Sequence, residues 1–510
     1  MKNLKTILLY IALALSVGAC KNVDFGDMNK NTNGPTEPDP QTLLTAAQVN
    51  YATITGREYL IRPTLYVQYQ TQNVYTDEMR YNEAASYWGQ YYANELSALQ
   101  EVIDFLDNPD NISPTILAKG AVENQKGVAM IMQALIYKRI TDTFGNVPYS
   151  EAIKGLDNLT PAYDSQESIY KGIIDQVKAA RDLMDESLAG PVGDIVYNGN
   201  VTRWKKFANS FILEASLQLS KKYPGATAYA ATEFKNALND ANGVIEDIND
   251  EAWFSFYNSA PGQNNPWSRN RAKDYNLSKE FTDALHGNTG LFALNPTSNH
   301  TLDLRLKVYS TDYTADGRPY GYDAVQAGDA QMDKTHWWNV KASLPLMTAS
   351  YTYLNRADAA NLGWTTEDVA TMLTNGIEAS YNSLNKYKVK PALDNGTEDE
   401  VADANELPNY APTYAAARVA DAGTTSFGQV IAEEKWVSLF PQGFDAWAEW
   451  RRTDFPTLQP AHDYLNNGQI PRRYIYPSDE SGLNGVNYQS GVNALVPQTD
   501  SNTSRVWWDQ

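Results

Sequence analysis

Apolar residues in the first third of the chain recur with the period of an α-helix. Val128, Ile131, Met132, Leu135 and Ile136 fall at the spacing i, i+3, i+4, i+7, i+8, so they share one face of a predicted helix. The glycine and proline in the sequence FGNVP, which follows directly, predict the end of that helix. Residues 203–219 repeat the pattern with Trp204, Phe207, Phe211, Ala215 and Leu219.

Predicted helices occur in adjacent pairs. Residues 427–439 and 444–451 form one pair, separated by the breaker Pro441-Gln442-Gly443. Asp164 followed by Glu167 resembles a capping box at the start of another helix. Stacked helix pairs are typical of helical-repeat proteins, although no clean repeat of about 34 residues is visible. The pattern therefore predicts a mostly α fold with a degenerate helix-pair scaffold.

Long irregular stretches rich in Gly, Pro, Asn or acidic residues interrupt the helices. They cover residues 255–273, 311–333 and 391–412. Ordered loops of this length are often functional. We therefore expect a single globular unit over 41–510, whose irregular portion around 250–345 and 391–425 carries the ligand site.

The N-terminus has the features of an export signal. Lys2 and Lys5 precede the apolar run 7–17, which is too short for a bilayer span of about 20 residues but suits a signal peptide. The run leads through Val17-Gly18-Ala19 to Cys20, which resembles a bacterial lipobox. We expect a signal peptide at 1–19, acylation of Cys20 and a polar tether at 20–40. An ordinary secretory signal with an unrelated cysteine is the alternative.

Composition excludes several classes of function. The chain of 510 residues has 41 Lys+Arg against 61 Asp+Glu, a formal net charge of −20. This balance argues against a protein that binds nucleic acids or anionic lipids, because such binding requires a basic face. A single cysteine cannot form an internal disulfide or a cysteine-based zinc site. The four histidines show no ligand spacing, so we expect no metal site and no cofactor.

Most catalytic signatures are absent from the sequence. There is no GxSxG elbow, P-loop or zincin motif, and no carboxylate pair stands out as a glycosidase pair. We therefore expect a binding protein and no enzyme. The run Glu398-Asp399-Glu400 could offer oxygens to calcium, but it lacks EF-hand spacing, and a solvated acidic loop is our interpretation.

The tryptophans divide by their surroundings. Those on predicted amphipathic helices are predicted core residues, namely Trp204, Trp436, Trp447 and Trp450. Aromatic rings in the irregular stretches have polar neighbours, which suits a sugar ring or a peptide side chain. The predicted ligand-binding residues are Trp267, Trp337, Trp338, Arg269, Tyr320 and Tyr322. If these rings instead cover a loop core, Tyr75 and Trp88 are the next candidates.

Several segments together resemble one family. The stretch 127–152 (GVAMIMQALIYKRITDTFGNVPYSEA) is similar to a helix and turn of SusD/RagB nutrient-binding lipoproteins. The segment 435–454 (KWVSLFPQGFDAWAEWRRTD), followed by IPRRYIYP, resembles the C-terminal signature of their SusD-like branch. One departure occurs in the helix at 347–360, where Ser350-Tyr351 and Ala357-Asp358-Ala359 replace positions that usually carry Glu.

This resemblance implies a fold, a location and a partner. The fold would be a scaffold of tetratricopeptide-like helix pairs with a less regular portion that carries the ligand site. The location would be the outer face of a Bacteroidota outer membrane, and the partner a TonB-dependent SusC-like transporter. We expect an oligosaccharide as the ligand. The alternatives are a peptide receptor of RagB type, a surface glycan hydrolase, or a plug that closes the transporter and binds nothing.

Overall fold

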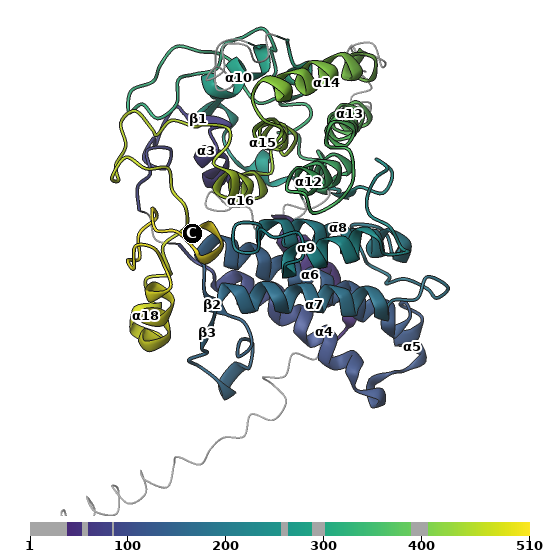
Figure 1. The fold of residues 1–510 in the computed structure, drawn as a ribbon. Helices are drawn as coiled ribbons and strands as arrows, with labels where there is room; N and C mark the ends of the chain where they lie inside the picture. The colour runs from purple at the N-terminus through teal and green to yellow at the C-terminus, as the bar shows by residue number, and fades with distance from the viewer. Residues whose placement is uncertain (1–37, 54–59, 84–85, 257–263, 288–300, 389–405) are drawn as a thin grey trace, which may run out of the picture. The chain divides into compact units, whose positions relative to one another are not determined.

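Helices dominate the part of the chain that the structure describes (Figure 1). The structure is a computed structural model, and it describes residues 38–53, 60–83, 86–256, 264–287, 301–388 and 406–510. Pro40–Gln510 is one compact unit. The predicted signal peptide, Cys20 and the acidic run at 398–400 lie outside the described residues. The mostly helical fold class predicted from periodicity is confirmed.

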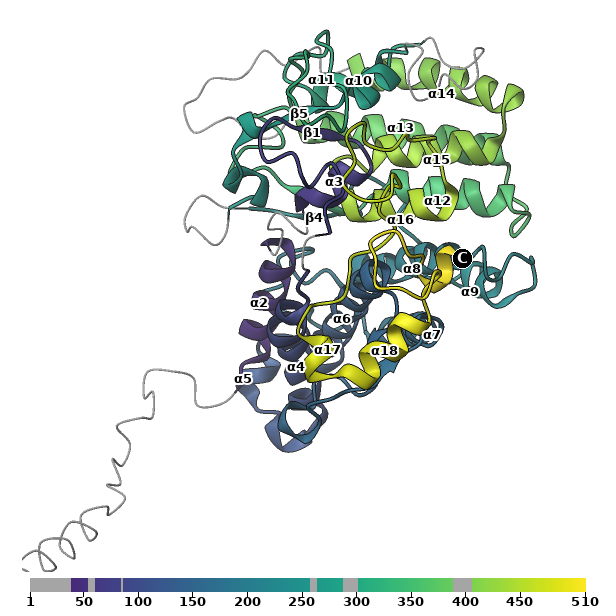
Figure 2. The same ribbon diagram turned by 90° about the vertical axis from the view of Figure 1, so that its left-hand side faces the viewer.

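The longer helices pack in pairs that follow the chain. They are α2 (Pro40–Thr53), α4 (Ser97–Asp107), α6 (Val122–Phe144), α7 (Gln166–Leu183), α8 (Val201–Gln218), α9 (Tyr229–Leu238), α12 (Ala349–Asn361), α13 (Val369–Lys388), α14 (Glu406–Thr424), α15 (Phe427–Ser438) and α16 (Gly443–Thr453). Helices α6 and α7, α8 and α9, and α12 and α13 form adjacent pairs, and α14 and α15 pack beside α13 (Figure 2). Helix α8 also contacts α12 and α16, which joins the earlier helices to the later ones.

The predicted helix face at 128–136 is the buried face of α6. Val128, Ile131 and Met132 are all fully buried there. The helix ends at Gly145, whose φ of 95° suits glycine and whose N–H donates to the Thr141 carbonyl at 2.8 Å. The periodicity prediction for this segment is therefore confirmed.

The capping box predicted for α7 is wrong by one residue. Ser165 is the N-cap, and its hydroxyl accepts the N–H of Ser168 at 3.1 Å. The Asp164 carboxylate instead accepts the N–H groups of Tyr149 at 3.1 Å and Ser150 at 2.8 Å. Asp164 thus fixes the turn that follows α6, while the neighbouring serine starts the next helix.

Shorter elements fill the irregular portions. The short α-helices are α3 (Arg62–Tyr66), α5 (Pro114–Leu117), α10 (Lys279–His286), α11 (Leu306–Tyr309), α17 (Glu480–Leu483) and α18 (Gly485–Asn493). A π-helix, η3, spans Tyr91–Leu96, and short 3₁₀ turns include η6 (Pro266–Arg269). Three antiparallel strand pairs are formed by β1 (Gln70–Gln72) with β5 (Tyr275–Leu277), β2 (Val147–Pro148) with β3 (Tyr163–Asp164), and β4 (Ala252–Phe254) with β6 (Leu344–Met347).

The tryptophans of α8 and of the C-terminal pair α15 and α16 lie in the core, as predicted. Trp204, Trp436, Trp447 and Trp450 are at most 6% exposed. The Trp436 indole donates to the Val67 carbonyl at 2.9 Å, and the Trp447 indole donates to the Pro471 carbonyl at 2.8 Å. The first bond ties α15 to a segment far away in the chain, and the second ties α16 to the segment that follows it.

The positions in α12 that depart from the family pattern belong to a buried polar network. The Tyr351 hydroxyl donates to Glu449 at 2.9 Å, and Asp358 accepts from Lys435 at 3.0 Å. Arg452 donates to Glu449 at 2.7 Å and also to Asp358. Tyr351 and Asp358 thus help to hold α12, α15 and α16 together, since buried charges require such partners.

Among the described residues, no helix combines the length and the apolar character that a membrane crossing requires.

Candidate ligand-binding surface

Three of the predicted ligand-binding rings lie inside the protein. Trp267, Trp337 and Tyr320 are at most 4% exposed. The Trp337 indole donates to the Val308 carbonyl at 2.9 Å, and its ring centroid lies 6.0 Å from that of Phe440. Trp337 and Tyr320 therefore offer no free face for stacking on a ligand in this structure, which corrects the expectation from the sequence. The irregular segments must bury apolar surface of their own, and these rings do so.

Two further predicted residues lie around η6. Trp338 is half-buried, its ring centroid lies 5.1 Å from that of Trp267, and its indole donates to the Asn270 carbonyl at 3.1 Å. Arg269 is exposed at the end of η6, with a guanidinium N 3.5 Å from the Asn264 carbonyl oxygen. The structure thus places Trp338 and Arg269 near the protein surface, in a different loop group from Tyr322.

Tyr322 stacks on a histidine that sequence reasoning missed. Its ring centroid lies 4.0 Å from that of His462, and the planes meet at 13°. The His462 side chain is 58% exposed, so the stacked pair reaches solvent. The pair joins the loop 318–325 to the loop 461–468.

Hydrogen bonds from backbone N–H groups hold the two loops of this stack together. The Asp463 N–H donates to the Gly321 carbonyl at 2.8 Å, and the Asp323 N–H donates to the Asp463 carboxylate at 2.8 Å. Gly321 has a φ of 80°, and a Cβ at this position would lie 2.4 Å from the Ala461 Cα. Only glycine therefore allows the two loops to approach this closely.

A third loop brings Tyr75 to the same surface. Tyr75 is 69% exposed and has a φ of 54°, an unusual value for a residue with a side chain. The next residue, Thr76, donates its hydroxyl to Asp323 at 3.1 Å, and Arg80 pairs with Asp323 at 3.0 Å. The Leu465 N–H donates to the Arg80 carbonyl at 2.7 Å. The loops 73–82, 318–325 and 461–468 therefore converge.

We call a set of side chains that these loops bring to the surface the aromatic loop surface; Tyr322 is half-buried and the others are exposed. It comprises Tyr75, Tyr322, His462, Tyr464 and Leu465. Tyr464 is 52% exposed, and its ring would lie 3.1 Å from a Cβ placed on Gly468. The glycine thus gives this ring the space that it occupies.

The surface combines apolar ring faces with hydrogen-bonding groups. The side chains of Asp77 and Asp323 are 63% and 67% exposed. The Asp323 N–H and the His462 ring hold the pKa of Asp463 below its ordinary value, so this carboxylate stays ionised. Rings that stack on the C–H face of a sugar, beside acceptors for its hydroxyls, form a suitable oligosaccharide site.

Sequence reasoning found this surface only in part. Tyr322 was a predicted ligand-binding residue, and Tyr75 was the next candidate after the loop tryptophans. Trp88, the other such candidate, is a core residue at 5% exposure. The turn Tyr464-Leu465-Asn466-Asn467-Gly468 carries the same signal as the tryptophan loops, an aromatic ring beside amides. His462 gives no such signal, because its partner is distant in the chain.

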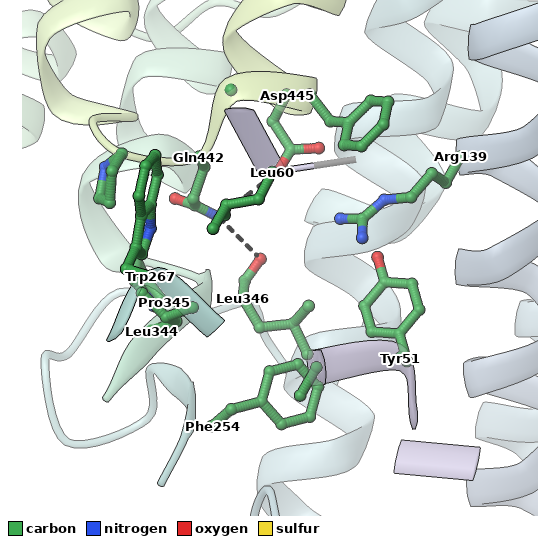
Figure 3. A pocket seen from close by; sticks show the side chains of 14 residues that line it. Tyr51, Leu60, Arg139, Phe254, Trp267, Leu344, Pro345, Leu346, Gln442 and Asp445 are labelled. Atoms are coloured by element: carbon green, nitrogen blue, oxygen red, sulfur yellow. Dashed lines mark hydrogen bonds between the residues drawn. The ribbon is translucent and has the colours of Figure 1, made fainter. Parts of the chain in front are cut away.

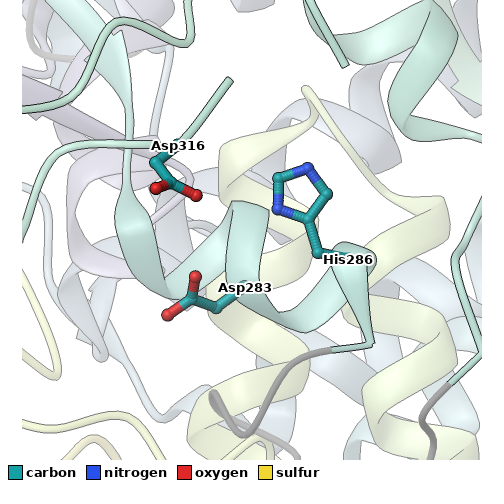
Figure 4. Close-up of side chains that lie close together, drawn as sticks. All are labelled: Asp283, His286 and Asp316. Carbon is teal, nitrogen blue, oxygen red and sulfur yellow. The ribbon is translucent and has the colours of Figure 1, made fainter. Parts of the chain in front are cut away.

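One group of side chains near α10 has the composition of a cation site (Figure 4). Asp283, His286 and Asp316 place one possible ligand atom each within 4.8 Å of one another. His286 Nε2 lies 2.7 Å from the Tyr313 carbonyl oxygen. Lys279 already donates to Asp283 at 2.7 Å and 2.8 Å, and this supplies positive charge at the group. The geometry alone therefore gives no reason to assign a metal.

Solved structures share this fold over nearly the whole chain. A chitin-binding protein is 24% identical, with a TM-score of 0.73, and the match covers 92% of this chain and 100% of that one. A SusD homologue from Bacteroides uniformis is 19% identical, with a TM-score of 0.69 and 92% and 98% coverage. A chitin-binding SusD homologue from Flavobacterium johnsoniae is 19% identical, with a TM-score of 0.63 and the same coverage.

Sequence comparison identifies the family. No curated protein matches the chain. A SusD-like family model with the description "Starch-binding associating with outer membrane" matches residues 32–477, which is most of the chain. The SusD/RagB resemblance of the sequence is therefore confirmed, and the chain belongs to this SusD-like family.

Proposed function

We propose that this protein binds an oligosaccharide at the aromatic loop surface on the outside of the outer membrane. The observation that carries the proposal is the solvent-facing stack of Tyr322 on His462, joined by hydrogen-bonded loops to Tyr75. Two of the structures with this fold are described as chitin-binding, and the family description names starch. A chain of α-linked glucose units or of β-linked N-acetylglucosamine units is therefore the class of ligand to test first.

The binding mode follows from the geometry of the surface. Flat rings gain from contact with the C–H face of a pyranose, and carboxylates such as Asp323 accept its hydroxyls. Stacking depends little on the linkage between sugars, so the surface suits a capture protein. The described residues supply no reason to invoke bond cleavage, and we propose binding without catalysis.

Anchoring and delivery complete the proposal. Acylated Cys20 would hold the protein on the membrane, because several buried acyl chains anchor stably where a single chain does not. A TonB-dependent SusC-like transporter would take the captured glycan across the outer membrane. The membership of the SusD-like family supports this partnership.

Calorimetric titration of the mature protein tests the ligand class. The panel contains malto-oligosaccharides, chito-oligosaccharides and an unrelated peptide mixture. Saturable binding of one of the sugars is the expected result. Binding of the peptides alone would favour a RagB-type receptor, and release of new reducing ends from the sugars would show a hydrolase.

A further inference from the structure

A mostly apolar pocket with two charged side chains in its lining lies between α2, α6, β6 and the start of α16. About 570 Å³ of space without protein atoms lies among the lining residues, and part of this space is open solvent. Arg139 and Tyr51 lie on one side, and Trp267 lies on the other with Leu344 and Pro345 (Figure 3). The pocket shares no residue with the aromatic loop surface.

The cation in this pocket, Arg139, makes cation–π contacts with two aromatic rings. The Arg139 guanidinium carbon lies 4.3 Å from the centroid of Tyr51 and 5.0 Å from that of Phe444. Among the described residues, no carboxylate forms an ion pair with Arg139. Next to it along α6, Lys138 pairs with Glu214 at 2.7 Å and Asp142 at 3.0 Å. Carboxylates thus neutralise the Lys138 charge directly, whereas the Arg139 guanidinium lines the pocket without an ion-pair partner among the described residues.

Asp445 supplies the complementary charge. It lies in the first turn of α16 and lines the same pocket. Its carboxylate has a 3.4 Å contact with the Gln442 amide and feels the Arg139 charge through space. The two opposite charges balance within the pocket, which favours a ligand without net charge.

A buried donor without a partner lies at the other end. Trp267 is fully buried, lines the pocket, and its indole N–H has no acceptor among the described residues. Trp204, Trp337, Trp436 and Trp447 are equally buried and all donate to protein oxygens. A buried donor normally has an acceptor. The missing acceptor for the Trp267 N–H points to an oxygen atom of a bound molecule.

We propose that this pocket binds one uncharged pyranose unit. Arg139 and Asp445 would bond hydroxyls at one edge of the sugar, and Trp267 would donate to an oxygen at the opposite edge. Phe254 and Leu346 provide the apolar contact for the C–H faces. An apolar amino acid carries its polar groups at one end and would leave the Trp267 N–H unbonded, so the sugar matches the pocket better.

The wild-type test uses the full mature chain with three probes: D-glucose, N-acetylglucosamine and L-leucine. Crystals soaked with each probe show where it binds. Sugar density between Arg139 and Trp267 is the expected result. No sugar in the pocket, or leucine in its place, would overturn the inference. Sugar at the aromatic loop surface alone would support the proposed function and refute this one, so the two failures are distinguishable.

Two variants test the assigned contacts by calorimetry. Trp267→Phe removes the indole N–H and keeps a ring, and we expect it to weaken sugar binding about fivefold. Asp445→Asn removes the charged acceptor and should weaken binding by about tenfold. Trp364→Phe is the matched control, since Trp364 is buried and bonded to the Pro224 carbonyl at 3.1 Å outside the pocket. Wild-type affinity in both pocket variants would refute the contacts.

Discussion

The Tyr322 ring lies nearly parallel to the His462 imidazole, with 4.0 Å between centroids. The two residues belong to loops that Gly321 and Asp463 lock together. Each ring therefore has a fixed plane before any ligand arrives. Preorganised rings lose little freedom on binding, which favours affinity at an otherwise exposed surface.

Trp447 should be a major source of stability. It is fully buried, its indole is bonded to the Pro471 carbonyl, and the Arg451 guanidinium lies 3.8 Å from its ring centroid. We expect Trp447→Ala to lower the free energy of unfolding by about 3–5 kcal/mol. Urea denaturation measures this, with Val486→Ala as the control because Val486 is 86% exposed. Equal midpoints for wild type and Trp447→Ala would contradict the placement of this ring.

The buried ion pairs of Arg418 should be equally important. Arg418 contacts Glu433 at 2.6 Å, Glu434 at 2.7 Å and Asp421 at 2.8 Å, with no exposure of its own side chain. Arg418→Ala would leave these carboxylates buried without their counter-ion. It should therefore lower the free energy of unfolding by about 3–5 kcal/mol.

The control for Arg418 is an exposed arginine. Arg271 is 62% exposed and lies 3.7 Å from Asp274, so Arg271→Ala should cost less than about 1 kcal/mol. If chemical denaturation shows similar losses in the free energy of unfolding for Arg418→Ala and Arg271→Ala, burial does not strengthen the ion pairs of Arg418.

Glu95 should give the fold a specific pH dependence. The residue is fully buried, and neither carboxylate oxygen has a hydrogen-bond partner among the described residues. Burial raises the pKa of Glu95 to about 7 from an ordinary value of 4.5. The folded state thus keeps a proton that the unfolded state loses, and stability falls as pH rises from about 4.5 to about 7.

Replacement of Glu95 tests that sign. Glu95→Gln should remove this part of the pH dependence, which corresponds to roughly 3 kcal/mol over the interval. Denaturation midpoints at pH 5 and pH 8 measure the slope for both proteins. If the variant keeps the wild-type slope, another group is responsible.

The lipid anchor has a direct test in cells. Cys20→Ser removes the thiol that would be acylated, so the protein should leave the washed membrane fraction. Ser16→Ala, in the same signal segment, should stay with the membrane. Membrane recovery of Cys20→Ser at the wild-type level would argue against a lipoprotein.

Local patterns predicted the helices well because a helix face is built from neighbours in the chain. The buried face of α6 around Ile131 and the buried Trp447 were both readable from spacing. The ligand site was less accessible to this reasoning. The polar neighbours of Trp337 in the sequence suggest a ligand-binding ring, but this ring packs near Phe440 in the core. The Tyr322 ring is held in place by stacking on His462. Such partners lie far apart in sequence, and no local spacing reveals them.

The affinity of Tyr322→Ala for the oligosaccharide that the wild type binds tests the central proposal most directly. A central aromatic contact typically contributes at least about 2 kcal/mol, so binding should weaken about thirtyfold in calorimetric titration. Tyr353→Ala on α12, outside the three loops, is the matched tyrosine control and should bind as the wild type does. Wild-type affinity in a folded Tyr322→Ala protein would contradict the assignment of the aromatic loop surface.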